Sequence, residues 1–349
     1  MTKVLLTGGS GFIAAHILDQ LLSKGHTVVT TVRSEDKAAR IRAAYPEQSA
    51  SGALTVAIVS DIAQPNAFDE VVAAHSDVEV VLHTASPFHF KFKDPQKELI
   101  SPAVNGTTGI LSAITRFAPS VRRVVITSSF AAIIDEAKVT DPSHTFTEVS
   151  WNPVTLADIH NSPATAYRAS KTLAEKAAWD FVNSGEGKGK FDLVTINPPM
   201  VFGPLAKAQY VSSPEAVNTS NERIVDLVKG RWKTNGTPAT GAAIIWVDVR
   251  DVARAHVKAG LELGEEVSGK RLFVVSGEFS NAEIARVVKK RFPEFEGVVP
   301  DEEGLKTGEI PPEDKRFRWD NSATRRLLGF EWIGLEESIV DAVESIKAL

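Results

Sequence analysis

Tyr167 and Lys171 are four residues apart in an alanine-rich segment of a chain that has only three tyrosines. On a helix this spacing places the phenol and the ammonium one turn apart on the same face. A positive charge beside a phenol lowers its pKa from about 10, so Tyr167 could give a proton to a developing alkoxide near neutral pH. Ser129, after a predicted strand, could hydrogen-bond the same oxygen. The spacing also occurs on solvated helix faces, so the pair needs support from other residues.

A glycine-rich turn near the N-terminus predicts a phosphate-binding site. Lys3–Thr7 is a short apolar run typical of a buried parallel strand, and a helical pattern begins after Gly11. The spacing fits Gly8-x-x-Gly11-x-x-Ala14 or Gly9-x-Gly11-x-x-Ala14, which is typical of a dinucleotide fingerprint. Glycine permits positive φ, and a helix N-terminus supplies free N–H groups and the positive end of a dipole. The residues expected at the cofactor here are Gly8, Gly9, Ser10, Gly11, Phe12 and Ile13.

The residues after the second predicted strand bear on the choice of cofactor. An NAD site needs a carboxylate there for the ribose 2′-hydroxyl, but this chain has Arg33, with Lys37 four residues on. Arginine can bind a dianionic 2′-phosphate with two hydrogen bonds, so the pair predicts NADP(H). Glu35 and Asp36 are contrary, although both suit a solvated helix start. At the end of the third strand, we expect Asp61 to accept from the adenine amine and Ile62 to pack on the ring.

The elements that must position these residues alternate between strand and helix. The predicted strands are Lys3–Thr7, His26–Val32, Leu54–Val59, Val78–His83, Arg123–Thr127 and Phe191–Ile196. The predicted helices between them are residues 11–24, Ala38–Tyr45, Ala67–His75, Pro95–Phe117 and Ala164–Val182. This alternation predicts an α/β fold with a Rossmann-type, doubly wound parallel sheet. Ligands bind outside the carboxyl ends of such strands, which adds Thr84, Ala85 and Ser86 to the expected cofactor contacts.

The pattern loosens beyond the sixth strand, which suggests a second lobe. We expect residues 1–197 to form the NADP-binding domain, with residues 243–263 returning to it. Residues 198–349 are expected to form mainly a smaller C-terminal lobe that binds the substrate. Later elements are predicted as a strand at Leu272–Val275 and helices at Ala282–Arg291, Ser322–Leu328 and Leu335–Ala348, with a surface loop at Pro300–Asp314.

Composition excludes several classes of function. The 349 residues carry 39 basic and 44 acidic side chains, so the net charge of −5 gives no electrostatic case for nucleic acid or an anionic membrane. No stretch approaches the roughly 18 apolar residues of a membrane helix, and no signal peptide is expected. Without cysteine there are no disulfides or thiol chemistry, and the scattered histidines predict no metal site. A cytoplasmic location is the default expectation.

Several motifs together carry a family resemblance. Thr7–Ala14, Thr127–Ser129, the Tyr167-x-x-x-Lys171 pair and Asn197–Pro204 occur in the order and at the separations of the extended short-chain dehydrogenase/reductases, which the chain resembles. Within them it looks most like the fungal NADPH-dependent methylglyoxal, aldehyde and ketone reductases, with plant dihydroflavonol 4-reductases as more distant relatives. Further stretches that support this are Leu82–Phe88, Pro102–Gly106, Ser150–Pro153, Glu175–Trp179 and Val247–Ala253.

The resemblance implies roles for individual residues. Ser129, Tyr167 and Lys171 match the catalytic triad, and Ser129 is preferred to Ser128 because it stands 38 positions before the tyrosine. Lys171 would also bind the nicotinamide ribose. Tyr167 is likewise expected to contact the cofactor. Asn105 resembles a helix asparagine that supports a proton relay. The remaining positions expected to touch the cofactor are Pro198, Val201 and Ser220.

Apolar residues near the expected nicotinamide end predict the substrate class. Phe88, Phe130, Met200 and Leu205 would form a pocket that favours aldehydes and ketones with alkyl or aryl groups over sugars. Each of these side chains could equally belong to the core. The pocket therefore predicts the chemical class of the substrate but not its identity.

Three hypotheses compete for this set of residues. The first is reversible NADPH-dependent reduction of a small aldehyde or ketone, with Tyr167 as proton donor. The second is a nucleotide-sugar epimerase or dehydratase, but dehydratases call for an Asp-Glu pair where this chain has Phe130-Ala131. The third is a non-catalytic NADP(H)-sensing protein, a class that tends to lose the tyrosine–lysine pair. The natural substrate stays open, as does the choice between monomer and homodimer.

Overall fold

A parallel sheet of seven strands forms the centre of the N-terminal part of the molecule, seen in a computed structural model that describes residues 1–86, 92–183, 185–209 and 211–349. The strand order is β10-β7-β5-β4-β1-β2-β3, and all six neighbouring pairs are parallel. The strands are β1 (Lys3–Thr7), β2 (Thr27–Val32), β3 (Leu54–Ile58), β4 (Val80–His83), β5 (Arg123–Thr127), β7 (Asp192–Ile196) and β10 (Arg271–Leu272). This is the Rossmann-type sheet that the alternation of elements predicted.

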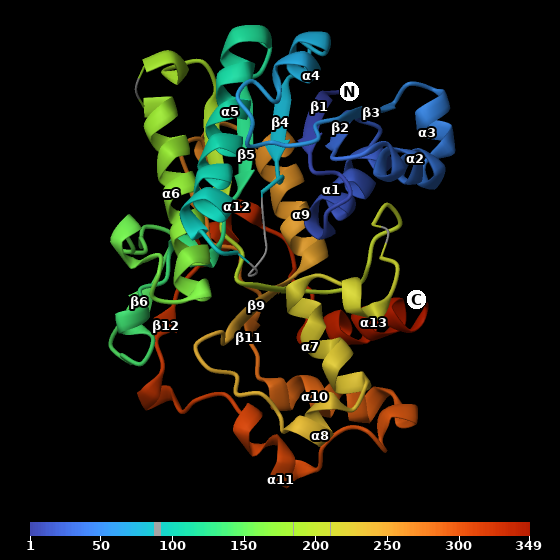
Figure 1. The fold of residues 1–349 in the computed structure, drawn as a ribbon, viewed down its shortest axis with the longest axis vertical. Helices are drawn as coiled ribbons and strands as arrows, with labels where there is room; N and C mark the ends of the chain where they lie inside the picture. The colour runs from blue at the N-terminus through green and yellow to red at the C-terminus, as the bar shows by residue number, and fades with distance from the viewer. Residues whose placement is uncertain (87–91, 184, 210) are drawn as a thin grey trace.

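Helices cover both faces of this sheet (Figure 1). The helices of this half are α1 (Phe12–Ser23), α2 (Glu35–Ala44), α3 (Pro46–Ala50), α4 (Asp69–Ala74), α5 (Ser101–Phe117), α6 (Pro163–Asn183) and α9 (Val249–Val257). Side chains alternate across the strands, so Val4 and Leu6 of β1 join the core under α1 and α9, whereas Leu5 joins the core under α4 and α5. Both faces are therefore apolar, as a strand buried on two sides requires.

The C-terminal lobe has a small sheet and its own core. Its strands β8 (Met200–Phe202), β9 (Ile245–Asp248) and β11 (Gly277–Glu278) pair in the order β11-β9-β8. Its helices are α7 (Thr219–Val228), α8 (Arg231–Asn235), α10 (Asn281–Arg291), α11 (Glu302–Leu305) and α13 (Leu335–Lys347). The helix α12 (Ser322–Leu328) instead lies beside the large sheet and places Leu328 in its core. A further parallel pair joins β6 (Thr145–Phe146) to β12 (Arg318–Trp319). In Figure 1 the lobe lies below the large sheet, beyond the carboxyl ends of its strands.

Some predicted boundaries differ from the observed ones. The strand predicted at Leu272–Val275 is shorter, and as β10 it completes the large sheet, although only residues 243–263 were expected to return. The helix after β9 is α9 to Val257 and continues as a π-helix over Lys258–Glu262, within the residues 243–263 that were expected to return to the cofactor domain. The predicted surface loop at Pro300–Asp314 contains α11, because Leu305 is fully buried in the C-terminal core.

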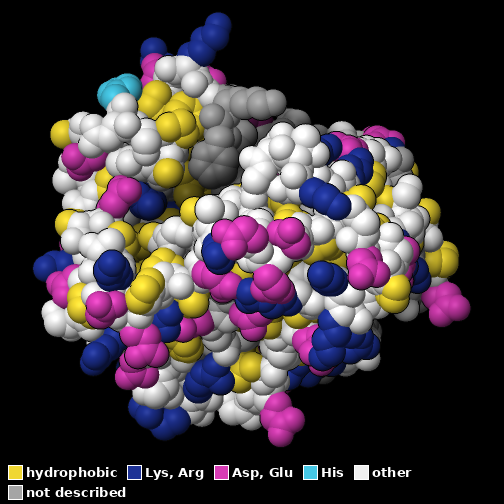
Figure 2. All heavy atoms as spheres, turned by 90° about the horizontal axis from the view of Figure 1, so that it is seen from below, with side chains coloured by type: hydrophobic (Ala, Val, Ile, Leu, Met, Phe, Trp, Pro, Cys, Tyr) yellow, Lys and Arg dark blue, Asp and Glu magenta, His cyan; other side chains and the backbone are white. Residues whose placement is uncertain are grey.

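Charges of both signs cover the face drawn in Figure 2, where Lys and Arg side chains are interspersed with Asp and Glu. Within the described ranges, no helix combines the length and apolar character needed to cross a bilayer. In the same residues, no three His, Asp or Glu side chains gather in a way that could hold a metal ion.

Candidate active site

The turn between β1 and α1 has the geometry of an anion cradle. Gly8 has φ of +77°, and a side chain at Gly9 would place its Cβ 2.1 Å from Thr30 Oγ1. Gly11 N–H donates to Gly8 O at 2.8 Å and precedes α1, which has no side-chain cap and no acid in its first turn. An uncapped helix N-terminus without a nearby carboxylate attracts anionic groups. The turn therefore fits a pyrophosphate. Of the other residues expected at the cofactor here, Ser10, Phe12 and Ile13 are half-buried in the same turn.

Arg33 and Lys37 are exposed just beyond β2. The two acids between them are paired elsewhere, because Glu35 lies 2.5 Å from Arg42 and Asp36 lies 3.1 Å from Arg40. Among the described residues, neither Arg33 nor Lys37 has an ion-pair partner within 4 Å. The acids that argued against a phosphate here are thus neutralised by their own arginines, and the two cations remain available.

Thr7, at the end of β1, holds the turn after β4 in place. Its hydroxyl accepts from Thr84 N and Ala85 N, both at 3.1 Å, and lies 2.9 Å from His83 Nδ1. The backbone of Ala85 approaches so closely that a Cβ on Gly8 would lie 3.2 Å from Ala85 Cα. Thr84, Ala85 and Ser86 are half-buried beside the glycine turn, where the carboxyl-end rule places them.

Asp61 lies exposed beyond β3, with Ile62 half-buried behind it. Hydrogen bonds from Gln64 Nε2 at 2.8 Å and Ala63 N at 2.9 Å hold the pKa of Asp61 below its ordinary value, so the carboxylate is an acceptor at neutral pH. Ile62 packs against α5, where Gly106 leaves room for its side chain. Asp61 and Ile62 could therefore offer an adenine a hydrogen-bond acceptor and an apolar surface, respectively.

Ser129, Tyr167 and Lys171 come together from two elements. Tyr167 and Lys171 lie on α6, and Ser129 follows β5. Tyr167 Oη donates to Ser129 Oγ over 3.5 Å, a long hydrogen bond, so the two hydroxyls are close enough for one further oxygen beside them to bond to both. Ser129 also accepts from Ala131 N at 3.1 Å, which fixes its rotamer. Its neighbour Ser128 is buried and donates to Glu175 instead, so the structure favours Ser129 as the hydroxyl beside the phenol.

Burial controls both titratable groups of this site. It raises the pKa of Tyr167, against a smaller opposing effect of the hydrogen bond with Ser129. It lowers the pKa of Lys171 to about 8, opposed by the negative charge of Glu175. The sequence-based expectation of a lowered phenol pKa is wrong for this structure, because desolvation by burial has the largest effect on the phenol. Tyr167 therefore stays protonated at neutral pH.

A cavity of about 270 Å³ opens beside the hydroxyls of Ser129 and Tyr167. Phe130 and Met200, both predicted, contribute to an apolar wall, and Ser220 lies at its edge, where its Oγ accepts from Val201 N at 3.2 Å. The complete lining is Ser129, Phe130, Ala131, Ile134, Ala164, Tyr167, Arg168, Pro199, Met200, Thr219, Ser220, Ala242, Ala243 and Ile245. A largely apolar cavity that also has hydroxyl side chains in its lining suits a small molecule that is mainly apolar and has a polar group.

Other predicted residues lie apart from this cavity. Leu205 is not in its wall but packs into the C-terminal core, with its N–H on Ser345 Oγ at 3.1 Å. Asn105 is exposed on α5 and, among the described residues, has no hydrogen bond to Ser129, Tyr167 or Lys171. The predicted pocket residue Phe88 lies outside the described residues. Pro198 and Val201 are buried, and Pro198 O accepts from Phe130 N at 2.8 Å.

The sequence analysis missed part of the wall. Arg168, which forms an ion pair with Glu136 at 2.5 Å, directly follows Tyr167 in the sequence, and that position was a usable signal. Ile134 lies one helical turn after Phe130, and this spacing was a weaker signal. Ala242, Ala243 and Ile245 precede or begin β9 and belong to no motif. A second cavity of about 530 Å³, beside Trp246 and Trp332, shares no lining residue with the first.

Comparison with known proteins gives consistent matches. A model of the NAD-dependent epimerase/dehydratase family matches residues 4–275. A ketoreductase of Aspergillus niger is 44% identical over 348 residues, covering 99% of this chain and 97% of that protein. Among solved structures, the Gre2 protein of Candida albicans in complex with NADPH is 37% identical with a TM-score of 0.87, covering 100% of this chain and 99% of that one. The yeast methylglyoxal/isovaleraldehyde reductase Gre2 with NADPH is 36% identical, also with a TM-score of 0.87, covering 99% and 98%.

Proposed function

The chain belongs to the NAD-dependent epimerase/dehydratase family, as an extended short-chain dehydrogenase/reductase, and we propose that it is an NADPH-dependent reductase of small aldehydes and ketones. The observation that carries the proposal is the hydroxyl pair of Tyr167 and Ser129, 3.5 Å apart at the wall of a mostly apolar cavity. Two relatives of similar length, a ketoreductase and a methylglyoxal/isovaleraldehyde reductase, support the same reaction class.

NADPH is the cofactor that the residues suit. The uncapped start of α1 would hold the pyrophosphate, and Arg33 with Lys37 would hold the 2′-phosphate. Asp61 and Ile62 would hold the adenine, and Lys171 the nicotinamide ribose. Bound NADPH supplies the hydride that the carbonyl carbon accepts. Two homologous structures that contain NADPH support this choice.

Tyr167 and Ser129 would handle the carbonyl oxygen. Ser129 donates a hydrogen bond that polarises the carbonyl, and Tyr167 gives its proton to the oxygen as negative charge develops there. The raised pKa of Tyr167 suits this direction of the reaction, because the phenol enters it protonated. In the reverse direction the phenolate must accept the alcohol proton, so Lys171 has its larger effect on alcohol oxidation. Asn105 stays a candidate for a proton relay through water.

The two alternative functions have less support. Phe130 and Ala131 follow Ser129, where a dehydratase would need acidic side chains, and both line the cavity. A sensing protein needs no proton donor, but Tyr167 and Ser129 are aligned for one. The substrate would be a small aldehyde or ketone with alkyl or aryl substituents. We also propose a cytoplasmic location, where NADPH would be available, and leave the oligomeric state open.

The test is consumption of NADPH with methylglyoxal, isovaleraldehyde or an aryl ketone, followed by absorbance. We expect turnover by the wild type and a loss of about 10²-fold or more in kcat for Tyr167→Phe, with the Kd for NADPH unchanged. Tyr45→Phe is the matched control, since Tyr45 donates to Asp19 in the cofactor domain, away from the cavity. A fully active Tyr167→Phe enzyme would remove the proton-donor role, and an inactive wild type would favour the sensing alternative.

A further inference from the structure

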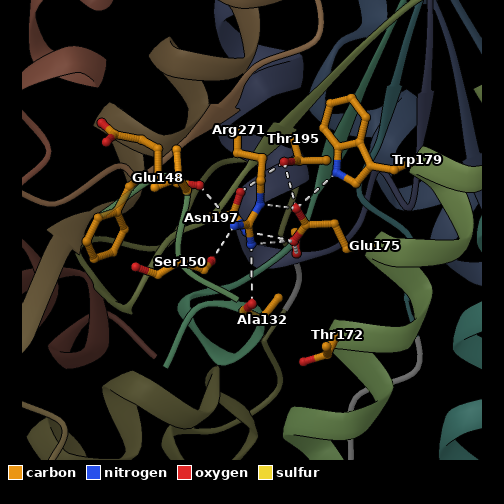
Figure 3. A network of polar contacts seen from close by, with 12 residues as sticks. Ala132, Glu148, Ser150, Thr172, Glu175, Trp179, Thr195, Asn197 and Arg271 are labelled. Atoms are coloured by element: carbon orange, nitrogen blue, oxygen red, sulfur yellow. Dashed lines mark hydrogen bonds and ion pairs between the residues drawn. The ribbon is translucent and has the colours of Figure 1, made fainter. Parts of the chain in front are cut away.

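Glu175 is a buried carboxylate one helical turn beyond Lys171 on α6. Its side chain is 1% exposed, and its partner Arg271 on β10, 8% exposed, places Nε 2.6 Å from Glu175 Oε1 (Figure 3). Arg271 also lies over the ring of Trp151, with 3.8 Å between Cζ and the ring centroid. Burying an ion pair costs several kcal/mol for each ion in desolvation, and apolar side chains of similar volume often give equal stability. The roles proposed above give neither Glu175 nor Arg271 a part in the reaction.

The carboxylate of Glu175 joins the ends of two neighbouring strands. Ser128 Oγ, just after β5, and Asn197 Nδ2, just after β7, both donate to Oε2, the second over 2.8 Å. Thr195 Oγ1 and Trp179 Nε1 donate to Oε1 at 3.1 and 3.2 Å. Figure 3 shows Thr195, Trp179 and Asn197 directed toward the Glu175 carboxylate. Glu175 therefore links α6, which carries Tyr167 and Lys171, to the strand end that carries Ser129.

Ser129 is held from two sides through this network. Asn197 Nδ2, bonded to Glu175, also donates to the carbonyl oxygen of Ser129 at 3.2 Å. From the other side, Arg271 Nη2 donates to Ala132 O at 3.3 Å, three residues beyond Ser129. Its Nη1 donates to Glu148 O at 2.9 Å and to Ser150 O. The backbone around Ser129 thus has few ways to move relative to α6.

We propose that Glu175 and Arg271 are positioning residues for carbonyl reduction, which set the separation of the Ser129 and Tyr167 hydroxyls by tying α6 to the ends of β5 and β7. The inference rests on the proposed function of the site. Neither residue touches the cavity, so the effect is carried by Ser128, Asn197 and the backbone of Ser129. A displacement of about 1 Å between reacting groups can cost about 10²-fold in rate.

The same two strands supply a matched control at their opposite ends. Arg123, at the start of β5, is 4% exposed and pairs with Asp192 at the start of β7, with 3.1 Å between Nη2 and Oδ2. It donates to three backbone carbonyls, those of Ala259, Leu263 and Gly264, just as Arg271 donates to three. Substitution of either arginine removes a buried guanidinium from an ion pair between packed segments, although Asp192 is 38% exposed where Glu175 is 1% exposed. Only Arg271 lies at the strand ends that carry the site.

The experiment compares Glu175→Gln with Asp192→Asn and Arg271→Met with Arg123→Met, all as full-length enzymes. For each variant the midpoint of thermal unfolding, the Kd for NADPH, and kcat and KM for the carbonyl are measured well below that midpoint. We expect losses of thermal stability in both sets but a loss of about 10- to 100-fold in kcat only for the Glu175 and Arg271 variants, with an unchanged Kd for NADPH. Equal kcat values for the two sets would overturn the inference.

The pH profile gives a readout that a general loss of stability would not change. The charge of Glu175 raises the pKa of Lys171. Among the residues that the structure describes, His83 on β4, Arg271 on β10 and Tyr167 on α6 are further titratable groups near this pair. Glu175→Gln should therefore move the alkaline limb of kcat/KM for NADPH to lower pH, and Asp192→Asn should leave it in place. If Glu175→Gln does not fold, Asn197→Ala tests the same link to Ser129, and full kcat in that variant would overturn the inference. A wild type without reductase activity would instead refute the proposed function.

Discussion

Ser128 and Ser129 are adjacent at the end of β5 and differ in what their hydroxyls contact. Ser128 is 5% exposed and is committed to Glu175, whereas Ser129 faces Tyr167 and the cavity. Successive side chains of an extended segment point in opposite directions, so one serine faces the interior of the protein and the other faces the site. The sequence spacing to the tyrosine favoured Ser129, and the contacts give the physical reason.

Alanine at each serine should therefore have a different effect. We expect Ser129→Ala to lower kcat by about 10²-fold, since it removes a donor to the developing oxyanion. Ser128→Ala should lower the free energy of unfolding by about 1–3 kcal/mol, because a buried acceptor loses its donor, and should reduce kcat less. Steady-state kinetics and urea unfolding of both variants measure these effects. A larger loss of kcat at position 128 would contradict the assignment.

Lys171 makes activity depend on pH. Burial lowers its pKa to about 8, so the ammonium is present below that pH and is lost as the pH rises through it. The pKa of Tyr167 is raised, so the phenol stays protonated over the same range. We expect kcat/KM for NADPH, which reports the free enzyme, to fall as the pH rises through about 8. In Lys171→Arg the side chain stays charged, and the alkaline limb should disappear. A limb that persists in this variant would assign it to another group.

At the scale of elements, the turn after β2 is where we expect the choice between NADPH and NADH to be made. Arg33 follows β2 at the position where an NAD site has a carboxylate for the ribose 2′-hydroxyl. The helix α2 begins two residues later, and its first acids form ion pairs with arginines of the same helix. The arrangement depends on α2 being helical, because Asp36 and Arg40 meet through the spacing of one turn. The acids of α2 are thus neutralised by arginines of the same helix, so they oppose a phosphate beside Arg33 less strongly.

Arg33→Ala should weaken the preference for NADPH. Loss of a hydrogen bond to a charged group removes about 1.5–3 kcal/mol, so the ratio of kcat/KM for NADPH to that for NADH should fall about 10- to 100-fold. Arg40→Ala is the matched control, since Arg40 lies on the same helix but pairs with Asp36. If both variants keep the wild-type ratio, the 2′-phosphate is bound elsewhere.

The elements with strong periodicity were predictable, and those that depend on distant partners were not. The strand before the glycine turn is buried as expected, because burial removes its run of apolar side chains from water. β10 has only two residues, and its place in the large sheet follows from its pairing with β7. Leu205 is apolar beside a motif, which does not distinguish a cavity wall from a core. The direction of the Tyr167 pKa shift depends on burial, which spacing along a helix does not report.

At the scale of the molecule, the two lobes share structure across the chain. α9 returns to the large-sheet half, where it packs on α1 and its Arg250 O accepts from Gln20 Nε2 at 3.0 Å. The lobes are joined where His16 Nε2 lies 2.9 Å from Pro204 O. Arg250 in turn pairs with Asp341 of α13 at 2.6 Å. The expected boundary at residue 197 therefore separates the substrate lobe from the cofactor domain only in part.

We expect residues 1–197, expressed alone, to fail to fold cooperatively. The fragment lacks β10 and α9, so β7 would have an unpaired edge and the apolar face of α1 would be exposed. A broad thermal transition with strong binding of a hydrophobic dye is the expected result, and NADPH should give no shift. The full-length chain is the control. A sharp transition that NADPH raises would show that the boundary is a true domain boundary.

The late arrival of β10 has a consequence for biosynthesis. Arg271 follows Glu175 by 96 positions, so a ribosome that adds about 5–20 residues per second makes the carboxylate roughly 5–20 s before its cation. During that interval β7 is an unpaired edge strand, and the Glu175 carboxylate lacks its partner Arg271. Until β10 is made, the chain therefore has a strand edge that could pair with another chain, and synthesis of β10 closes it.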